Sequence, residues 1–201
     1  RSSLSVESSQ RQSMTNGGGT NGGTVTDTQM IKALDLLKDR DFNVSMDAGW
    51  CSPAYQKAMA AMAEKKMNHI ALLSVPYESE ANSDYINALL DYRNNKLNLN
   101  TSYAALYSGY LKIRDKFNDR DLWIAPTGTV GALISNTITK YEPWYPVSGD
   151  KRGQISWAVD VLRHYEEGEM DILQDAQINP ILFDPGKGIK VWGQRTLQSF
   201  P

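Results

Sequence analysis

The sequence contains few of the residues on which metal binding and nucleophilic catalysis depend. It has one cysteine, Cys51, and two histidines, His69 and His164, among 201 residues. A single cysteine cannot form a disulfide within the chain, which favours a reducing environment. His164 has no histidine four residues away and no cysteine cluster, so its surroundings do not match a zinc site. We therefore expect no metal and no cofactor, and a solvated side chain for His164.

Charge of one sign and long apolar runs are also scarce. The net charge is −2 and no basic block occurs, so nothing favours binding to nucleic acid. The longest apolar run, IALLSVP, is too short to span a bilayer, so we expect no membrane insertion. The sequence shows no signal peptide and begins at Arg1 rather than at Met, which indicates a processed or excised fragment.

Two regions of different composition are present. Residues 1–25 are rich in Ser, Gly, Thr, Asn and Gln and include NGGGTNGG, a segment that cannot form a core and is entropically costly to order. We expect a flexible linker or loop over 1–25. Residues 26–201 show regular hydrophobic patterns, and their length is sufficient for one domain with a core of its own.

The first half of this domain alternates helical and strand patterns. Apolar residues recur at helical spacing in three segments, which begin near Thr26 or Asp27, at Ser52-Pro53, and at Asn82 or Ser83. Strand patterns follow each of them, in the segments FNVSMD, HIALLSVP and SYAALYS. Two of these are continuous apolar runs, as in strands covered on both faces. The order predicts an α/β fold with a doubly wound, mostly parallel sheet flanked by helices.

The second half predicts a mixed antiparallel portion. YLKIRDKF and DLWIAP are typical of a hairpin that turns at Asn118-Asp119, and ILFDPGKGIKVWG is typical of a second hairpin. PTGTVGALISNTITK predicts a helix in which Gly128 and Gly131 allow close backbone approach. YEPWYPVSGDKRG predicts an irregular aromatic loop, SWAVDVL a strand, and EMDILQDA a short helix.

An α/β sheet of this kind raises the alternative of an enzyme, because such sheets bind ligands at the carboxyl ends of their strands. Asp47-Ala48-Gly49 follows a predicted strand and is similar to the aspartate motif of subtilisin-like proteases. The sequence contains no G-x-S-x-G element, and the Gly-rich segments lack the spacing of nucleotide-binding loops. Cys51 would need a converging histidine and acid to act as a nucleophile. A divergent α/β hydrolase or nucleotide-binding enzyme stays the alternative to a protein without catalytic residues.

Three segments occur in an order that is characteristic of one protein family. They are APTGTVGALIS (125–135), ILQDAQINPI (172–181) and GIKVWGQRTL (188–197). The chain resembles the tail sheath proteins of contractile-tailed bacteriophages, in which APSG.VAG, LN..GVN.I and VWG.RTL follow one another. The match covers most of residues 20–198. The chain departs from the pattern at Gln177-Ile178-Asn179 and in the loop Tyr145-Pro146-Val147-Ser148, which indicates a divergent branch.

The resemblance implies a structural subunit without catalytic residues or cofactor. Sheath subunits polymerise helically around a tail tube and contract to drive it through the host envelope. The implied partners are other sheath subunits and the tube protein, and the implied location is the virion, after assembly in the host cytoplasm. The implied fold is a sheath core with subtilisin-like topology, truncated before the C-terminal assembly region and monomeric by itself. A sheath of a related contractile injection or type VI secretion system stays open.

The same resemblance gives the structural residues that we expect to matter. KVWGQRTL should be the last strand of the core, with the indole of Trp192 packed inside and Gly193 beside it. The alternative for Trp192 is a direct contact with a neighbouring subunit. Arg195 and Thr196 should anchor the chain where it leaves the domain. Gly128 and Gly131 should bring their helix close to the sheet.

Overall fold

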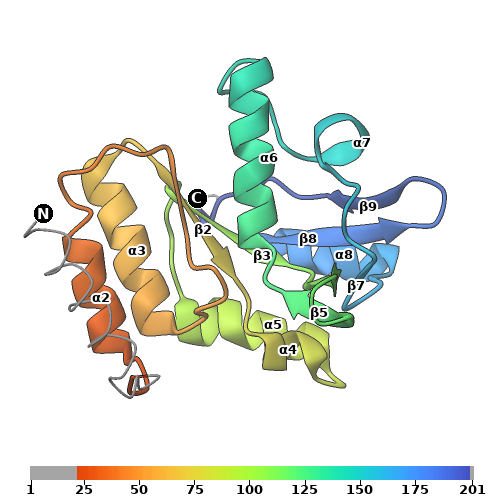
Figure 1. Ribbon diagram of the computed structural model, residues 1–201, viewed down its shortest axis with the longest axis horizontal. Coiled ribbons are helices and arrows are strands. Elements are labelled where there is room, and N and C mark those ends of the chain that lie inside the picture. The colour runs from red at the N-terminus through yellow and green to blue at the C-terminus, as the bar shows by residue number, and fades with distance from the viewer. Residues whose placement is uncertain (1–21, 200–201) are drawn as a thin grey trace, which may run out of the picture.

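A six-stranded sheet forms the centre of the computed structural model, which describes residues 22–199 (Figure 1). Most of the predicted linker, residues 1–25, lies outside the described residues. The strand order is β1-β2-β3-β8-β9-β6. The strands are β1 (Val44–Met46), β2 (Ile70–Ser74), β3 (Ala104–Ser108), β6 (Gln154–Ile155), β8 (Ile178–Asp184) and β9 (Gly188–Val191).

The sheet is parallel in one half and antiparallel in the other. β1, β2, β3 and β8 pair in parallel, with Leu106 of β3 opposite Ile178 of β8. β8 and β9 form an antiparallel hairpin, and β6 pairs antiparallel with β9. The sequence predicts both the buried strands and the terminal hairpin. That the hairpin joins the sheet beside β3 is a long-range pairing that no local pattern indicates.

Helices cover both faces of the sheet. One apolar core lies under α2, α3, α5 and α8, and the other lies under α6. A π-helical segment, η1, continues directly from α5. The helices are α2 (Asp27–Asp35), α3 (Pro53–Lys66), α4 (Tyr77–Ala81), α5 (Tyr85–Asp91), η1 (Tyr92–Leu97), α6 (Thr127–Lys140), α7 (Gly149–Arg152) and α8 (Glu167–Asp175).

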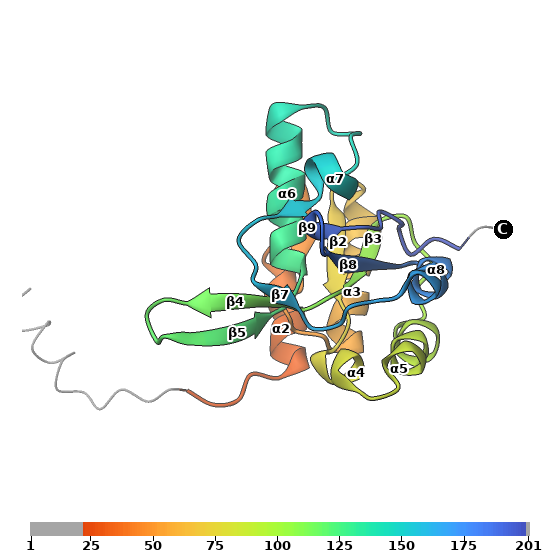
Figure 2. The same cartoon turned by 90° about the vertical axis from the view of Figure 1, so that its right-hand side faces the viewer.

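A second, three-stranded sheet has the order β5-β4-β7. β4 (Leu111–Asp115) and β5 (Arg120–Ile124) form the predicted hairpin, and β7 (Asp160–Val161) pairs with the base of β4. Figure 2 shows that the β4–β5 hairpin projects away from the rest of the molecule.

Helix starts follow local capping chemistry. Thr26 is the N-cap of α2 and forms a capping box with Gln29, as the sequence predicts for a threonine before an apolar periodic segment. Pro53 is the first residue of α3, where its missing N–H leaves no hydrogen bond unmade. α5 begins after Asp84, so the prediction of Asn82 or Ser83 as its cap was wrong by one or two residues.

Two predictions for residues 141–162 need correction. The aromatic segment contains the short helix α7, although it is otherwise irregular. SWAVDVL is not a continuous strand, because only Asp160–Val161 is in strand conformation. Trp157 and Val159 are exposed. β7 pairs with the base of β4 alone, because the rest of β4 projects away from the molecule together with β5.

Candidate functional site

The segment that follows β9 is held to the sheet along its whole described length. The Trp192 N–H donates to the Pro180 carbonyl at 3.0 Å, and the Leu197 N–H donates to the Ala104 carbonyl at 2.9 Å. The side chain of Leu197 is fully buried in the core. Residues 192–197 therefore pass from β8 to the start of β3 and tie two parallel strands together.

Asn179 is the residue that fixes this segment. It is fully buried on β8, and its amide Nδ2 donates to the carbonyls of Leu106 at 3.0 Å and Arg195 at 2.7 Å. Its Oδ1 accepts the Arg195 N–H at 2.7 Å. A buried amide with both ends satisfied in this way stabilises one register of three chain segments.

Gly193 is required by the same contact. A Cβ at residue 193 would lie 2.5 Å from Asn179 Oδ1 and 2.9 Å from Asn179 Cα. Only a residue without a side chain lets the two backbones approach this closely. The Trp-Gly-x-Arg-Thr motif and the segment Gln177-Ile178-Asn179, which are separate in sequence, therefore form one structural unit.

Two arginines complete the anchor. Arg195 Nη1 donates to the Gln174 carbonyl at 2.8 Å, at the C-terminal end of α8, where a cation is favourable for the helix dipole. The buried Arg93 on η1 donates to the carbonyls of Ala176 and Leu197, each at 3.1 Å. Burial lowers the pKa of Arg93. Arg195 thus links residues 192–197 to the end of α8.

Sequence reasoning missed Arg93 and the role of Asn179. A signal for Arg93 exists, because it lies four residues from both Leu89 and Leu97 and therefore on the apolar face of its helix. A charged residue at such a position needs partners inside the protein. Asn179 has no such signal, since its partners are separated from it by 16 and 73 residues.

The expectation that Trp192 is a core residue was wrong. Its exposed fraction is 42%, and its ring lies 5.4 Å from the Lys190 ammonium in cation–π geometry. Lys190 is itself buried and pairs with Asp150 at 2.6 Å and Asp184 at 3.0 Å. β9 ends at Val191, so residues 192–197 lie beyond the strand and the prediction that KVWGQRTL is the last strand was wrong for them.

The remaining predicted residues are Gly128, Gly131 and Thr196, and only Gly131 makes the close contact expected of it. At Gly131 an added Cβ would lie 2.9 Å from Met46 Cε and 3.7 Å from Leu72 Cδ1, so α6 approaches β1 and β2 closely there. At Gly128 no atom lies within 4 Å, so the approach expected at that position does not occur. Thr196 is partly buried and lines a groove beside α6, with no hydrogen bond from its side chain among those of the described residues.

Asp47 forms the centre of a buried polar cluster at the carboxyl ends of β1 and β2. Its carboxylate accepts hydrogen bonds from Gln56 Nε2 at 2.7 Å, Ser74 N at 2.7 Å, Ser74 Oγ at 2.8 Å and Thr127 Oγ1 at 2.9 Å. Burial raises the pKa of Asp47, and these hydrogen bonds oppose the rise. The cluster joins β1, β2, α3 and α6, and Asp47 also closes the turn to Gly49.

The arrangement around Asp47 lacks the parts of a nucleophilic site. The nearby Cys51 is a protonated thiol at neutral pH, because burial raises its pKa to about 11. His69 instead packs on Phe42, and the exposed His164 pairs with Asp160 at 2.8 Å. Among the described residues no imidazole lies beside Ser74 or Cys51, so the histidine-activated arrangement of a serine or cysteine nucleophile is not formed there. Residues 22–199 also contain no group of three potential metal-binding side chains.

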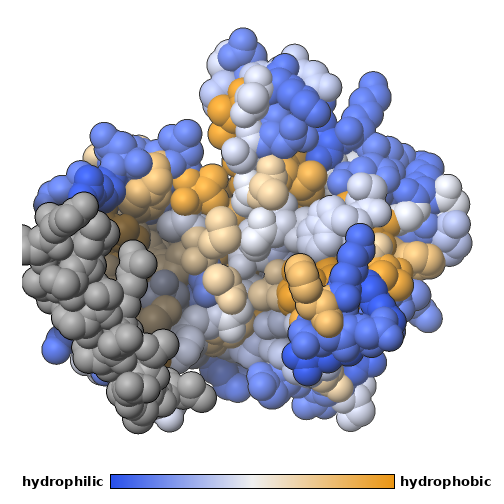
Figure 3. All heavy atoms as spheres, in the orientation of Figure 1, coloured by the Kyte–Doolittle hydropathy of each residue, from blue (hydrophilic) through white to orange (hydrophobic). Residues whose placement is uncertain are grey.

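Large apolar side chains remain on the surface. They occur in the loop between α6 and α7 and on the β4–β5 hairpin, and Figure 3 shows apolar patches between hydrophilic ones on one face. In the part of the chain that the structure describes, no helix is long and apolar enough to cross a membrane. Aromatic side chains that are exposed together on a protein surface are typical of contact surfaces.

Comparison with known proteins identifies relatives of one kind. No protein-family model matches the chain. It is 25% identical over 207 residues to the tail sheath protein of Enterobacteria phage T4, covering 92% of the chain and 31% of that protein. It is 31% identical over 100 residues to the tail sheath protein of Vibrio phage KVP40, covering 50% of the chain and 15% of that protein. The resemblance to tail sheath proteins is confirmed.

Solved structures show the same fold. The sheath complex of the PVC extracellular contractile injection system, in its contracted state, matches with a TM-score of 0.66 at 18% identity, over 90% of the chain and 48% of the sheath protein. The contracted helical sheath of the anti-feeding prophage matches with a TM-score of 0.62 at 16% identity, over 90% and 46%. The mixed α/β fold is thus that of a sheath protein. The chain spans about a third of the T4 sheath protein and less than half of the matched sheath structures.

Proposed function

We propose that this chain is part of a subunit of a contractile phage tail sheath. Such a subunit polymerises helically around a tail tube and contracts to drive the tube through the host envelope. The observation that carries the proposal is the similarity to the T4 tail sheath protein over 92% of the chain. The Asn179–Gly193 contact supports it, because it gives a structural reason for the motif that the sheath resemblance rests on.

The domain division follows from the same proposal. Residues 26–201 form one core domain of the subunit with a subtilisin-like arrangement, and residues 1–25 form a linker that leads into it. Further segments of the subunit extend beyond this chain, as its coverage of only 31% of the T4 protein favours. In this role the protein needs no cofactor, binds sheath and tube subunits, and functions in the virion after assembly in the host cytoplasm.

The rigid exit after β9 suits this role. A sheath subunit must transmit force to its neighbours while the subunits rotate. The segment that leaves the domain must therefore stay attached to the domain under load. Asn179, Arg93 and Arg195 hold residues 192–197 to three different elements, the strand β8, the segment η1 and the end of α8. In this proposal, residues 192–197 are the part of the domain through which force passes to the next subunit, and their hydrogen bonds resist their detachment.

Electron microscopy of the complete polypeptide tests the proposal. We expect long hollow tubes of uniform diameter when the protein is purified or expressed with its tube partner. The comparison is the same polypeptide with Asn179→Ala. This substitution removes the side chain that bonds the backbone N–H and C=O of Arg195, and it should give fewer and shorter tubes. A complete polypeptide that stays monomeric at all concentrations, with or without a tube protein, would contradict the proposal.

A further inference from the structure

A groove beside α6 reaches down to the sheet at β2 and β3. It has a volume of about 270 Å³ and is open to solvent. Its walls are α6, the loop between α6 and α7, and the segment after β9. We call it the α6 groove, and its lining includes Tyr107, Ile134, Thr137, Ile138, Tyr145 and Thr196.

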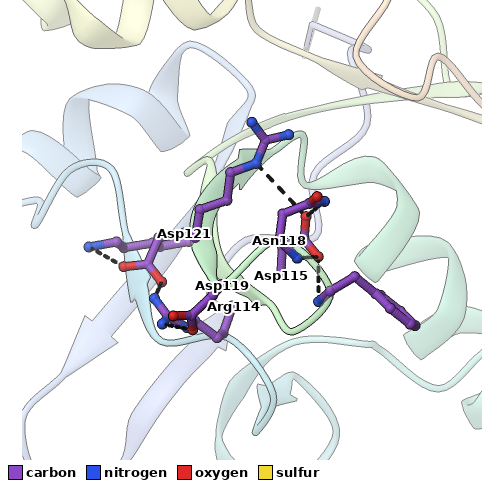
Figure 4. Close-up of polar contacts among 8 residues, drawn as sticks. Arg114, Asp115, Asn118, Asp119 and Asp121 are labelled. Atoms are coloured by element: carbon purple, nitrogen blue, oxygen red, sulfur yellow. Dashed lines mark hydrogen bonds and ion pairs between the residues drawn. The ribbon is translucent and has the colours of Figure 1, made fainter.

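No charged side chain lines the α6 groove among the residues that the structure describes. This absence is local, because charged residues make up 22% of the whole sequence. On the β4–β5 hairpin, for example, Arg114 pairs with Asp119 and, at 3.2 Å, with Asp121 (Figure 4). A charged group that entered the groove would lose its water without gaining an ion pair there. The groove therefore favours an uncharged occupant.

Two buried residues with hydroxyl groups line the groove, and neither hydroxyl forms a hydrogen bond with the described residues. They are Tyr107 on β3 and Thr137 on α6, each with an exposed fraction of 3%. Thr139, two residues further along α6, instead donates to the Ser135 carbonyl at 2.8 Å. Burial raises the pKa of Tyr107, so its hydroxyl remains a donor at neutral pH. Because buried polar groups are normally hydrogen-bonded, these two favour an occupant that carries a polar atom.

An aromatic ring stands at the rim of the groove. Tyr145 lines it and has an exposed fraction of 43%. Its ring is held by the ring of Tyr141, at 5.8 Å between centroids, and by the Arg152 guanidinium at 4.9 Å. Such a ring can pair with a second aromatic group, and Ile134 and Ile138 add apolar surface. The groove volume of about 270 Å³ exceeds the roughly 150 Å³ in which an engineered cavity holds a benzene ring.

The groove also contains a part of the sheath motif that the domain itself does not use. In WGQRTL, Gly193 packs on Asn179 and Arg195 bonds the end of α8. The side chain of Thr196 instead lines the groove, without a hydrogen bond to the described residues. Trp144, whose two neighbours in sequence line the groove, has an exposed fraction of 76%. A motif residue without a partner in its own domain, close to an exposed tryptophan, indicates a contact surface.

From these observations we infer that the α6 groove receives one tyrosine side chain of a neighbouring sheath subunit. The phenol ring packs against Tyr145 and the two isoleucines, and its hydroxyl bonds those of Tyr107 and Thr137. The inference rests on the proposed function, since a helical polymer places a second copy against each subunit.

Small probes test the chemistry of the groove. p-Cresol is the side chain of tyrosine, and the methyl signals of Ile134, Thr137 and Ile138 report its binding in NMR titrations of the 201-residue chain. We expect saturable shifts with a dissociation constant on the order of 1 mM. The charged analogues 4-methylbenzoate and 4-methylbenzylammonium should bind about tenfold more weakly or not at all. Equal binding of the charged probes, or no shift with p-cresol, overturns the inference.

Two nearly isosteric variants test the hydroxyl groups. Tyr107→Phe and Thr137→Val should each weaken p-cresol binding by about fivefold, the effect of one hydrogen bond. Neither should weaken the binding of toluene, which has no hydroxyl. Thr139→Val is the control, because Thr139 does not line the groove, and it should bind p-cresol as the parent does. Parental affinity for p-cresol in both groove variants overturns the inference.

Polymerisation of the complete subunit tests the partner. Thr196→Trp fills the groove and should raise the critical concentration by about tenfold. Thr139→Trp places the same side chain on the exposed side of α6 and should polymerise as the parent does. Tyr107→Phe, which keeps the shape of the groove, should raise the critical concentration by about fivefold.

The outcomes separate the inference from the proposed function. The complete subunit should bind p-cresol before it polymerises, and its polymer should not. A complete subunit that binds no p-cresol before it polymerises has the groove filled from within, which overturns the inference. Parental polymerisation of both Thr196→Trp and Tyr107→Phe also overturns it and leaves the proposed function standing. The absence of polymers from the parent subunit contradicts the proposed function itself.

Discussion

Gly193 and Asn179 show how a single close contact can determine a motif. The carboxamide of Asn179 occupies the space where any side chain at position 193 would begin. Because Asn179 is fully buried and bonded at both ends, it cannot move aside without leaving polar atoms unpaired.

We expect Gly193→Ala to lower the free energy of unfolding by about 2–3 kcal/mol, as overpacking in a rigid core does. The matched control is Gly128→Ala, where no atom lies within 4 Å of the new methyl group. This control should be neutral or slightly stabilising, by up to about 1 kcal/mol, because alanine favours the helix. Urea denaturation of both variants measures the two effects. Equal stabilities would show that residue 193 has room that the structure does not indicate.

Trp192 contributes less to stability than a motif tryptophan suggests. Its exposed fraction of 42% and its position over Lys190 indicate that it loses only part of its surface area on folding. Trp192→Ala should therefore cost about 1 kcal/mol, well below the 3–5 kcal/mol of a core aromatic. Thermal unfolding checks this value. A loss in the core range would mean that the indole packs more tightly than its exposure indicates.

At the scale of elements, the segment η1 connects the most distant parts of the chain. Arg93 on η1 binds the carbonyl that follows α8 and the carbonyl of Leu197 in the exit segment. All its acceptors are neutral oxygen atoms, and its removal leaves the buried Leu197 carbonyl without this donor.

We expect Arg93→Met to lower the free energy of unfolding by about 2–4 kcal/mol, since methionine retains the apolar stem but donates no hydrogen bond. Lys96→Met on the same segment is the control, because Lys96 is exposed and forms only a surface ion pair with Asp91 at 3.5 Å. Hydrogen exchange should show faster exchange of the Leu197 amide in the Arg93 variant alone. Unchanged protection of that amide would mean that Arg93 does not hold the exit segment.

The sequence predicts those elements whose formation depends on residues that are close along the chain. β2 and β3 are continuous apolar runs, and the β4–β5 hairpin has its turn between adjacent strands. The docking of η1 on the exit segment and the position of β8 beside β3 involve contacts between residues 104 and 73 positions apart, Arg93–Leu197 and Asn179–Leu106. For the same reason the motif indicated that residues 192–197 matter, but not that Gly193 rather than Trp192 faces the core.

At the scale of the molecule, a buried carboxyl group makes stability depend on pH. Glu80 of α4 is fully buried, and its carboxylate accepts the N–H groups of Gly109 at 3.0 Å and Tyr110 at 3.1 Å. Burial raises the pKa of Glu80 from 4.5 to about 7. The folded protein therefore holds a proton that the unfolded chain has already released over this range.

Stability should consequently fall as pH rises from about 4.5 to 7, by an amount on the order of 3 kcal/mol from this group. The pKa of His69 is lowered by burial, which acts in the opposite direction below pH 6.5, so a comparison of variants is needed to isolate Glu80. Glu80→Gln should remove the share of the fall that comes from Glu80 and leave the share of Asp47, whose pKa burial also raises. The exposed Glu78→Gln should leave the whole profile as in the parent. Denaturation at pH 5 and pH 8 measures this. Parallel pH profiles for the parent and Glu80→Gln would show that Glu80 titrates normally in the folded state.

Assembly is the last property of the whole molecule. A subunit that must stay joined to its neighbours while their bodies rotate needs contacts that tolerate reorientation. Main-chain strand addition by an arm provides such contacts, because it does not depend on how the bodies face each other. Residues 192–199 are hydrogen-bonded to the domain, and the net charge of −2 provides no strong attraction between copies. We therefore expect the 201-residue chain to be monomeric at micromolar concentration, and the complete subunit to form tubes. Sedimentation velocity of both measures this. Ordered polymers of the 201-residue chain would mean that the core alone contains the contacts that build the sheath.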